Sequence, residues 1–143
     1  MSNYTLTASL LDSLTMGMCV FDAQDRTVLW NEHFLRFFPE HADHIHAGEP
    51  YQENLRRFYR VRLPAEPQTS IERYVQDGIK RHREQVGAYL FAHRGRQLRV
   101  ACVAQPNGDR VRVWQDLSAM ESVLLNLAGK QDSALPQGVG PTA

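Results

Sequence analysis

The sequence of 143 residues has only two cysteines, no long apolar run and no net charge. Cys19 and Cys102 lie in predicted strands and are too few for the disulfide framework of a small secreted domain. The apolar runs are far shorter than the roughly 20 residues that span a membrane, and the N-terminus lacks the features of a signal peptide. Because sixteen basic residues balance sixteen acidic ones, no general attraction to nucleic acid or anionic membrane is expected. We therefore expect one cytoplasmic domain with neither kind of partner.

Short motifs of common catalytic sites are also absent. The sequence has no nucleophile elbow, phosphate-binding glycine loop, metalloprotease motif or paired-cysteine metal site. His41, His44 and His46 lie in the polar stretch 40–48, but their spacing does not place all three on one helix face. We interpret this stretch as a solvated loop rather than a metal site. We expect neither enzymatic activity nor a bound metal.

The most informative stretch is 17–31. Two short runs rich in β-branched and aromatic residues, 18–21 and Thr27–Trp30, flank a polar segment, which is typical of a β-hairpin. Asn31 then follows as a helix cap, with Glu32 in the first turn. The apolar face of this helix consists of Phe34, Leu35, Phe37 and Phe38. The order strand, turn, strand and capped helix is therefore predicted.

Helical and then alternating patterns follow. Apolar spacing predicts one helix from Pro50 to about Arg62 and another that is capped by Ser70 and ends in a basic run. Strands are predicted at 88–93, 97–104 and 110–116, separated by glycine-containing turns, as in an antiparallel sheet with one covered face. These strands and turns carry five arginines that we interpret as a solvated face, with a carboxylate or phosphate site as the alternative: Arg94, Arg96, Arg99, Arg110 and Arg112.

Amphipathic helices are predicted at both ends. In the first helix, Leu6, Leu10, Leu11 and Leu14 share one stripe, which suits either packing on its own domain or a dimer contact. In the last helix, Leu117, Met120, Leu124 and Leu127 recur every three to four residues, and Ser118 with Glu121 forms a capping box. The tail 130–143 is rich in Gly, Pro, Gln and Ser and is expected to be disordered.

The opening pattern resembles a PAS domain, of the bacterial sensory type found ahead of histidine kinases and diguanylate cyclases. Asp22 closes the first strand, Trp30 and Asn31 close the second, and Asp116-Leu117-Ser118 matches the family's Asp–aliphatic–Ser/Thr junction with a signalling helix. The resemblance covers about Leu10 to Met120. It implies an α+β PAS fold: a five-stranded antiparallel sheet, helices inserted between the second and third strands, and helices at both ends. The expected parts are an N-terminal helix at 1–16, the core at 17–116, a signalling helix at 117–129 and the tail.

The resemblance also implies a function. We expect a sensor or adaptor that homodimerises and relays a change through its last strand and C-terminal helix. Because the remaining residues are too few for an output domain, the receiver would be a separate histidine kinase, diguanylate cyclase or regulator. Contacts with a second copy or a partner are expected at Leu6, Leu10, Leu14, Met120, Leu124 and Leu127. The alternatives are a gas or redox sensor and a purely structural dimerisation module.

A ligand pocket of unidentified specificity is the last expectation. Its candidate lining residues, whose alternative role is ordinary core packing, are Trp30, Phe34, Phe38, Phe58, Tyr74, Tyr89, Phe91 and Trp114. A haem would take a histidine from the long helix before the third strand, where His82 lies. The basic neighbours of His82 favour a solvent-facing helix end instead. Flavin–thiol photochemistry is excluded because no cysteine lies between Asn31 and Ala101.

Overall fold

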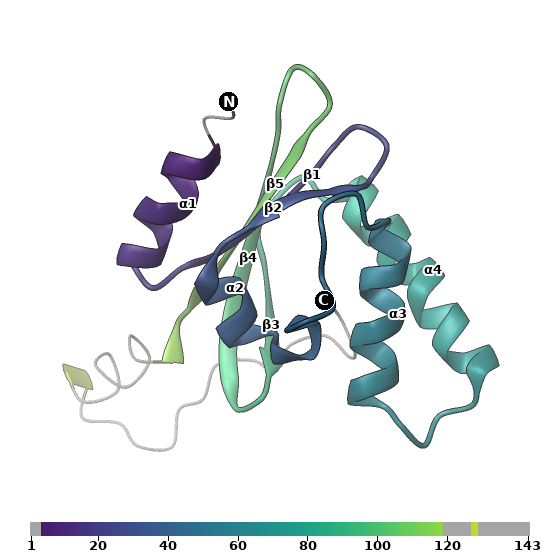
Figure 1. The fold of residues 1–143 in the computed structure, drawn as a ribbon. Coiled ribbons are helices and arrows are strands. Elements are labelled where there is room, and N and C mark those ends of the chain that lie inside the picture. The colour runs from purple at the N-terminus through teal and green to yellow at the C-terminus, as the bar shows by residue number, and fades with distance from the viewer. Residues whose placement is uncertain (1–3, 119–126, 129–143) are drawn as a thin grey trace.

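The computed structural model describes residues 4–118 and 127–128 (Figure 1). Its five strands form one antiparallel sheet in the order β2-β1-β5-β4-β3. Their bounds are β1 Gly17–Phe21, β2 Thr27–Trp30, β3 Tyr89–His93, β4 Arg96–Ala104 and β5 Arg110–Asp116. The pairing of β1 with β5, from Gly17 opposite Trp114 to Phe21 opposite Arg110, joins the first hairpin to the last strands. The predicted fold class is confirmed.

One face of the sheet is covered by the helical segment between β2 and β3 (Figure 1). This segment comprises α2 Glu32–Phe37, the short 3₁₀ helix η1 Pro39–His41, α3 Tyr51–Arg62 and α4 Gln68–Glu84. Asn31 caps α2 as predicted, because its side chain accepts a hydrogen bond from the Phe34 amide. The predicted cap at Ser70 is wrong: α4 begins after Pro67, whose fixed φ and missing N–H suit a helix start.

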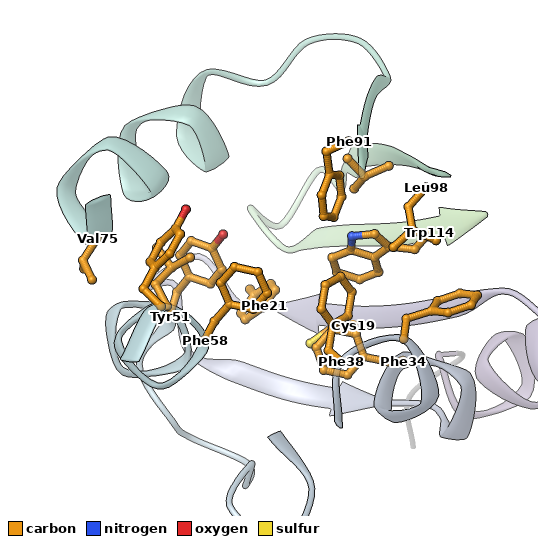
Figure 2. Close-up of a cluster of buried hydrophobic side chains, with 14 of the residues drawn as sticks. Cys19, Phe21, Phe34, Phe38, Tyr51, Phe58, Val75, Phe91, Leu98 and Trp114 are labelled. Carbon is orange, nitrogen blue, oxygen red and sulfur yellow. The ribbon is translucent and has the colours of Figure 1, made fainter. Parts of the chain in front are cut away.

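The core is divided between the two faces of β1. All five residues of this strand are buried, which explains its uninterrupted apolar run. Cys19 and Phe21 pack with the inserted helices (Figure 2). Met18 and Val20 face the opposite side of the sheet. Fully burying an aromatic or aliphatic side chain contributes about 1.5–3 kcal/mol, so the aromatic cluster of the inner face dominates the hydrophobic stabilisation.

The other face of the sheet carries α1 Tyr4–Ser13. Ala8 is buried there, and Tyr4 and Leu11 pack against Met18 and Val20. The predicted leucine stripe is therefore split, because Leu11 faces the domain while the others face outward. Leu6, Leu10 and Leu14 are 77%, 57% and 56% exposed. In the last predicted helix, Leu127 is exposed, and Met120 and Leu124 lie outside the described residues.

Four polar residues that were expected at the surface are buried. Glu40 and His41 are buried in η1, so the prediction of a solvated loop is wrong for the first residues of 40–48. His82 is 1% exposed and does not form a solvent-facing helix end, and Arg112 is 1% exposed on the inner sheet face. Each of these side chains has partners distant in sequence, which local composition does not reveal. Within residues 4–118 and 127–128, no helix combines the length and apolarity needed to cross a bilayer.

Candidate functional site: a polar cavity on the inner face of the sheet

A small internal cavity lies between β5 and the inserted helices. Its volume is about 10 Å³, close to the space that one water molecule needs. It is lined by Phe21, Phe34, Phe38, His41, Tyr51, Asn54, Arg112 and Trp114. Figure 2 shows Trp114 beside Phe34 and Phe38, with ring centroids 5.1 and 5.3 Å apart. The sheet thus contributes a cation and an indole, and the helices contribute aromatic rings, an imidazole and an amide.

Three of the eight predicted pocket residues, Phe34, Phe38 and Trp114, line this cavity. The remaining five lie around it in the inner core: Phe58 and Phe91 are fully buried, and Trp30, Tyr74 and Tyr89 are partly buried against the same cluster. The sequence-based list omits the polar lining residues. For Arg112 a signal existed, because residues two apart on a strand share a face and Arg112 therefore lies beside Trp114.

Arg112 is the charged centre of the site. Its Nη1 donates to the Tyr51 hydroxyl at 3.1 Å and its Nη2 donates to the Tyr89 hydroxyl at 2.9 Å. The guanidinium also lies over the Trp114 ring, 5.2 Å from its centroid. Because an arginine stays charged and burying an ion costs several kcal/mol, these contacts offset a large desolvation penalty. A positive charge is therefore held at the cavity wall.

Two further donors at the cavity have no hydrogen-bond partner among the described residues. Asn54 Nδ2 and Trp114 Nε1 are both buried, and their side chains belong to the cavity lining. An indole N–H only donates, and an unsatisfied buried donor costs about 1–3 kcal/mol. The lining therefore retains unused hydrogen-bonding capacity.

His41 is held neutral beside this wall. Its Nδ1 accepts a hydrogen bond from Arg57 Nε at 2.9 Å, and Arg57 in turn forms two bonds to Glu49, at 2.6 and 2.8 Å. Burial lowers the pKa of His41 to about 3, with the nearby Arg57 charge as the second cause. Because Nδ1 acts as the acceptor, the single proton of the neutral ring lies on Nε2.

His82 packs behind Tyr51, with ring centroids 4.0 Å apart, and its Nε2 contacts Asp25 Oδ1 at 3.3 Å. Burial lowers the pKa of His82 to about 2, and Arg112 adds to this effect. Phe21 meets the ring edge-on at 5.2 Å. The imidazole lines neither the inner cavity nor the outer one described below. This packing does not fit an axial haem ligand.

A second cavity of about 200 Å³ lies on the outer side of Tyr51. It is lined by Gln24, Asp25, Pro50, Tyr51, Gln52, Ile79 and Arg83. Tyr51 is the one residue in the lining of both cavities. Its side chain is held in place by the hydrogen bond from Arg112 and by stacking on His82. Tyr51 therefore separates the inner cavity from the outer one.

The predicted junction of residues 116–118 is tied to the start of β4. The Ser118 amide donates to Asp116 Oδ1 at 2.9 Å, while Ser118 Oγ accepts from the Gln97 amide at 3.0 Å. The Leu117 amide donates to the Gln97 carbonyl at 2.8 Å, and Arg96 pairs with Asp116 at 3.2 Å. The serine cap that was expected to serve a following helix is thus bonded to a neighbouring strand.

The turn end of the β3–β4 hairpin, where His93 pairs with Arg96, is also held by η1. Glu40 Oε2 lies 3.1 Å from His93 Nε2 and 3.0 Å from Arg94 Nε. Arg94 and Gly95 form the two-residue β3–β4 turn, and both have positive φ, a conformation that glycine adopts readily. The hairpin therefore connects the helical layer near the cavity with the junction after β5.

Comparisons with known proteins identify the architecture. A family model described as the PAS fold matches residues 11–123. No curated protein gives a significant match. The PAS domain of BvgS from Bordetella pertussis is 18% identical with a TM-score of 0.49, covering 85% of this chain and 94% of that one. A C-terminal domain from Streptococcus mutans is 14% identical with a TM-score of 0.45, covering 86% and 94%. Within the described residues, no group of three or more His, Cys, Asp or Glu is placed to hold a metal ion.

Proposed function

The chain belongs to the PAS fold family, and we propose that it is a sensory or adaptor module that homodimerises and passes a change in its core to a separate signalling protein. PAS domains are generally sensory or signalling modules and are typically non-catalytic. We propose that this chain is likewise not an enzyme. The receiver would be a histidine kinase, a diguanylate cyclase or another regulator.

The observation that carries this proposal is the position of the cavity on β5. Arg112 and Trp114 line the cavity, and Asp116 follows on the same face of the strand. A ligand or a side-chain movement at the cavity therefore acts on β5 within a few residues of the junction. Because Asp116, Leu117 and Ser118 are bonded to one another or to Gln97, a shift of β5 against β4 changes those bonds directly.

Hydrogen exchange tests the relay. Asn54 lies on α3, in the cavity wall opposite β5, so Asn54→Leu alters the lining without changing any residue of β5. We expect it to change the exchange rate of the Leu117 and Ser118 amides. The matched control is Gln76→Leu, which likewise replaces an amide side chain by leucine, at an exposed position of α4 that lines neither cavity. If Asn54→Leu leaves both junction amides as they are in the wild type, the cavity does not act on the junction and a structural dimerisation module becomes the better interpretation.

For the dimer, α1 offers the surface. Its three exposed leucines form a stripe on a helix that is fixed to the domain, since the Tyr4 hydroxyl donates to Asp109 at 2.8 Å and Asp12 accepts from the His33 amide at 2.9 Å. We propose that a second copy of the chain covers this stripe, burying the leucines against each other.

Sedimentation equilibrium measures the dimer. Leu6→Asp with Leu10→Asp is expected to weaken dimerisation at least tenfold, because two charges would enter the apolar contact. Val61→Asp, at an exposed apolar position of α3, is the control and leaves the dimer intact. A double α1 variant that dimerises like the wild type would rule out this interface.

A further inference from the structure

The inner cavity presents mainly hydrogen-bond donors. Four of its eight lining residues carry N–H groups: His41, Asn54, Arg112 and Trp114. Of the others, three are phenylalanines and one is Tyr51, whose oxygen already accepts from Arg112. Burial raises the pKa of Tyr51 to about 12, so its hydroxyl keeps its proton at neutral pH. Among the eight described lining residues there is no aspartate or glutamate.

This set of donors suits a water molecule poorly. A buried water usually makes about three hydrogen bonds and donates two of them. Asn54 Nδ2 and Trp114 Nε1 both require an acceptor, whereas the lining offers a water proton only the side-chain oxygens of Asn54 and Tyr51, the second of which already accepts from Arg112. A group that only accepts satisfies both N–H groups and also lies near the Arg112 charge. The chemistry of the lining therefore favours an anion over water.

We propose that the inner cavity binds a small monovalent anion, either a halide ion or the carboxylate of a small organic acid, through Arg112, Asn54 and Trp114. The present volume of about 10 Å³ holds one particle the size of a water molecule, and a halide ion is somewhat larger, so its binding requires a slight expansion of the cavity. A carboxylate needs more room, and movement of Tyr51 would join this cavity to the outer one of about 200 Å³. This inference rests on the proposed sensory function and names the class of ligand that the core would sense.

Tryptophan fluorescence reports on this site directly. The chain has two tryptophans, Trp30 and Trp114, so Trp30→Phe leaves a single indole at the cavity. The full chain with this substitution is titrated with sodium chloride, sodium bromide and sodium acetate, at constant ionic strength set by sodium sulfate. We expect a saturable change in Trp114 emission. Saturation with the halides alone identifies a halide site, and saturation with acetate identifies a carboxylate site.

In the Trp30→Phe protein, Asn54→Leu removes one hydrogen-bond donor from the cavity. The leucine fills this buried position with an apolar side chain of similar length. We expect at least tenfold weaker anion binding. Arg99→Gln removes an exposed arginine from the other face of the sheet and is expected to bind as the parent does. Emission that changes linearly with every salt, to the same extent in parent and Asn54→Leu, overturns the proposal.

Failure of the anion site and failure of the relay give different results. If the anion binds saturably but Asn54→Leu does not change the amide exchange of Leu117 and Ser118, the anion site is supported and the relay is contradicted. If Asn54→Leu changes the exchange of these junction amides but the protein binds no anion, the relay is supported and the proposed class of ligand is wrong.

Discussion

Tyr51 carries an unusual number of roles for one side chain. It accepts from the buried Arg112, stacks on His82, and lines both cavities. Its hydroxyl is one of two phenol oxygens bonded to a fully buried guanidinium, and hydrogen bonds to charged groups are stronger than neutral ones. The Tyr51 hydroxyl oxygen is therefore expected to contribute more to the stability of the inner core than a single buried methylene group does.

Tyr51→Phe tests this role. We expect it to lower the free energy of unfolding by about 1–3 kcal/mol, because a buried donor of Arg112 loses its acceptor. Tyr59→Phe is the matched control on the same helix: its hydroxyl lies 3.5 Å from Arg81 Nη2, at the limit of hydrogen bonding. We expect a loss below about 1 kcal/mol there. Urea unfolding measures both, and equal losses would contradict the assigned role of Tyr51.

Two of the buried histidines, His41 and His82, make the stability of the protein depend on pH. The pKa of His41 is about 3 and that of His82 about 2 in the folded chain, against an ordinary value of 6.5. Between these values the unfolded chain binds a proton at each histidine and the folded chain does not, so stability decreases as the pH falls below 6.5. Each histidine contributes at most about 1.4 kcal/mol per pH unit.

Urea midpoints at pH 7.5, 6.5, 5.5 and 4.5 measure this slope. His82→Gln is expected to reduce it by up to about 1.4 kcal/mol per pH unit, because one of the two linked protonations disappears. Lys80→Gln, which changes an exposed side chain without an imidazole on the same helix as His82, is the control and is expected to keep the wild-type slope. A wild-type protein equally stable at pH 4.5 and 7.5 would show that neither buried histidine is excluded from protonation.

At the scale of elements, Asn31 joins three of them. Its Oδ1 accepts from the Met18 and Phe34 amides at 2.8 and 3.0 Å, and its Nδ2 donates to the Ala8 and Met16 carbonyls at 3.3 and 2.8 Å. The sequence predicted the cap on α2, because an asparagine before an acidic first turn is a local signal. The bonds to α1 and β1 were not predictable, because they depend on where those elements pack.

Asn31→Ala tests whether Asn31 stabilises the fold only as the cap of α2 or also through its hydrogen bonds to α1 and β1. A lost cap costs about 1 kcal/mol on its own, and we expect about 2–4 kcal/mol here because buried donors and acceptors of α1 and β1 are also left unsatisfied. Asn31→Asp keeps the oxygen that accepts from Met18 and Phe34 but loses the donor to Ala8 and Met16. Its free energy of unfolding is expected to lie between those of the wild type and Asn31→Ala. Chemical unfolding that shows only the ordinary cost of a cap would argue against the connecting role.

The helix α1 shows where periodicity stops being informative. A spacing of three to four residues correctly groups Leu6, Leu10 and Leu14, but it wrongly adds Leu11 to them and does not state which face the domain covers. The small Ala8 allows close approach to β1, and Tyr4 reaches Asp109 in the β4–β5 turn, so the covered face is set by these two residues. The leucine stripe is left outward, where it is available to a second copy.

At the scale of the whole molecule, the fold was predictable and much of the site was not. The strand patterns, turns and junction motif specify the sheet, because each depends on neighbours in sequence. Of the aromatic lining residues, Phe34, Phe38 and Trp114 were named from the sequence, whereas Phe21 and Tyr51 were not. The polar half of the lining was not predictable: Arg112 is tolerated inside because Tyr51 and Tyr89 come from α3 and β3, and His41 because Arg57 lies on α3. Such pairing across elements is fixed only when the chain is folded.

The connection from η1 to the junction also belongs to this scale. Glu40 holds His93 and Arg94 at one end of β3, and the following residues Arg96 and Gln97 hold the junction. Glu40→Gln weakens this contact, because a neutral amide replaces the carboxylate that faces the Arg94 guanidinium and the His93 ring. If the hairpin moves as a unit, we expect the Leu117 and Ser118 amides, which lie next to Gln97, to exchange faster by a factor of about ten, equivalent to about 1.4 kcal/mol of local stability.

Glu66→Gln is the control for that measurement, since the Glu66 side chain contacts Tyr74 on α4, away from the hairpin. Its junction amides are expected to exchange at the wild-type rate. Faster exchange at His93 alone in Glu40→Gln would show that β3 loosens without its neighbour β4, and the route from the cavity to the junction would then run through β5. Faster exchange at both positions means that the helical layer reaches the junction along two strands, so that a change at η1 and a change at Arg112 converge on Ser118.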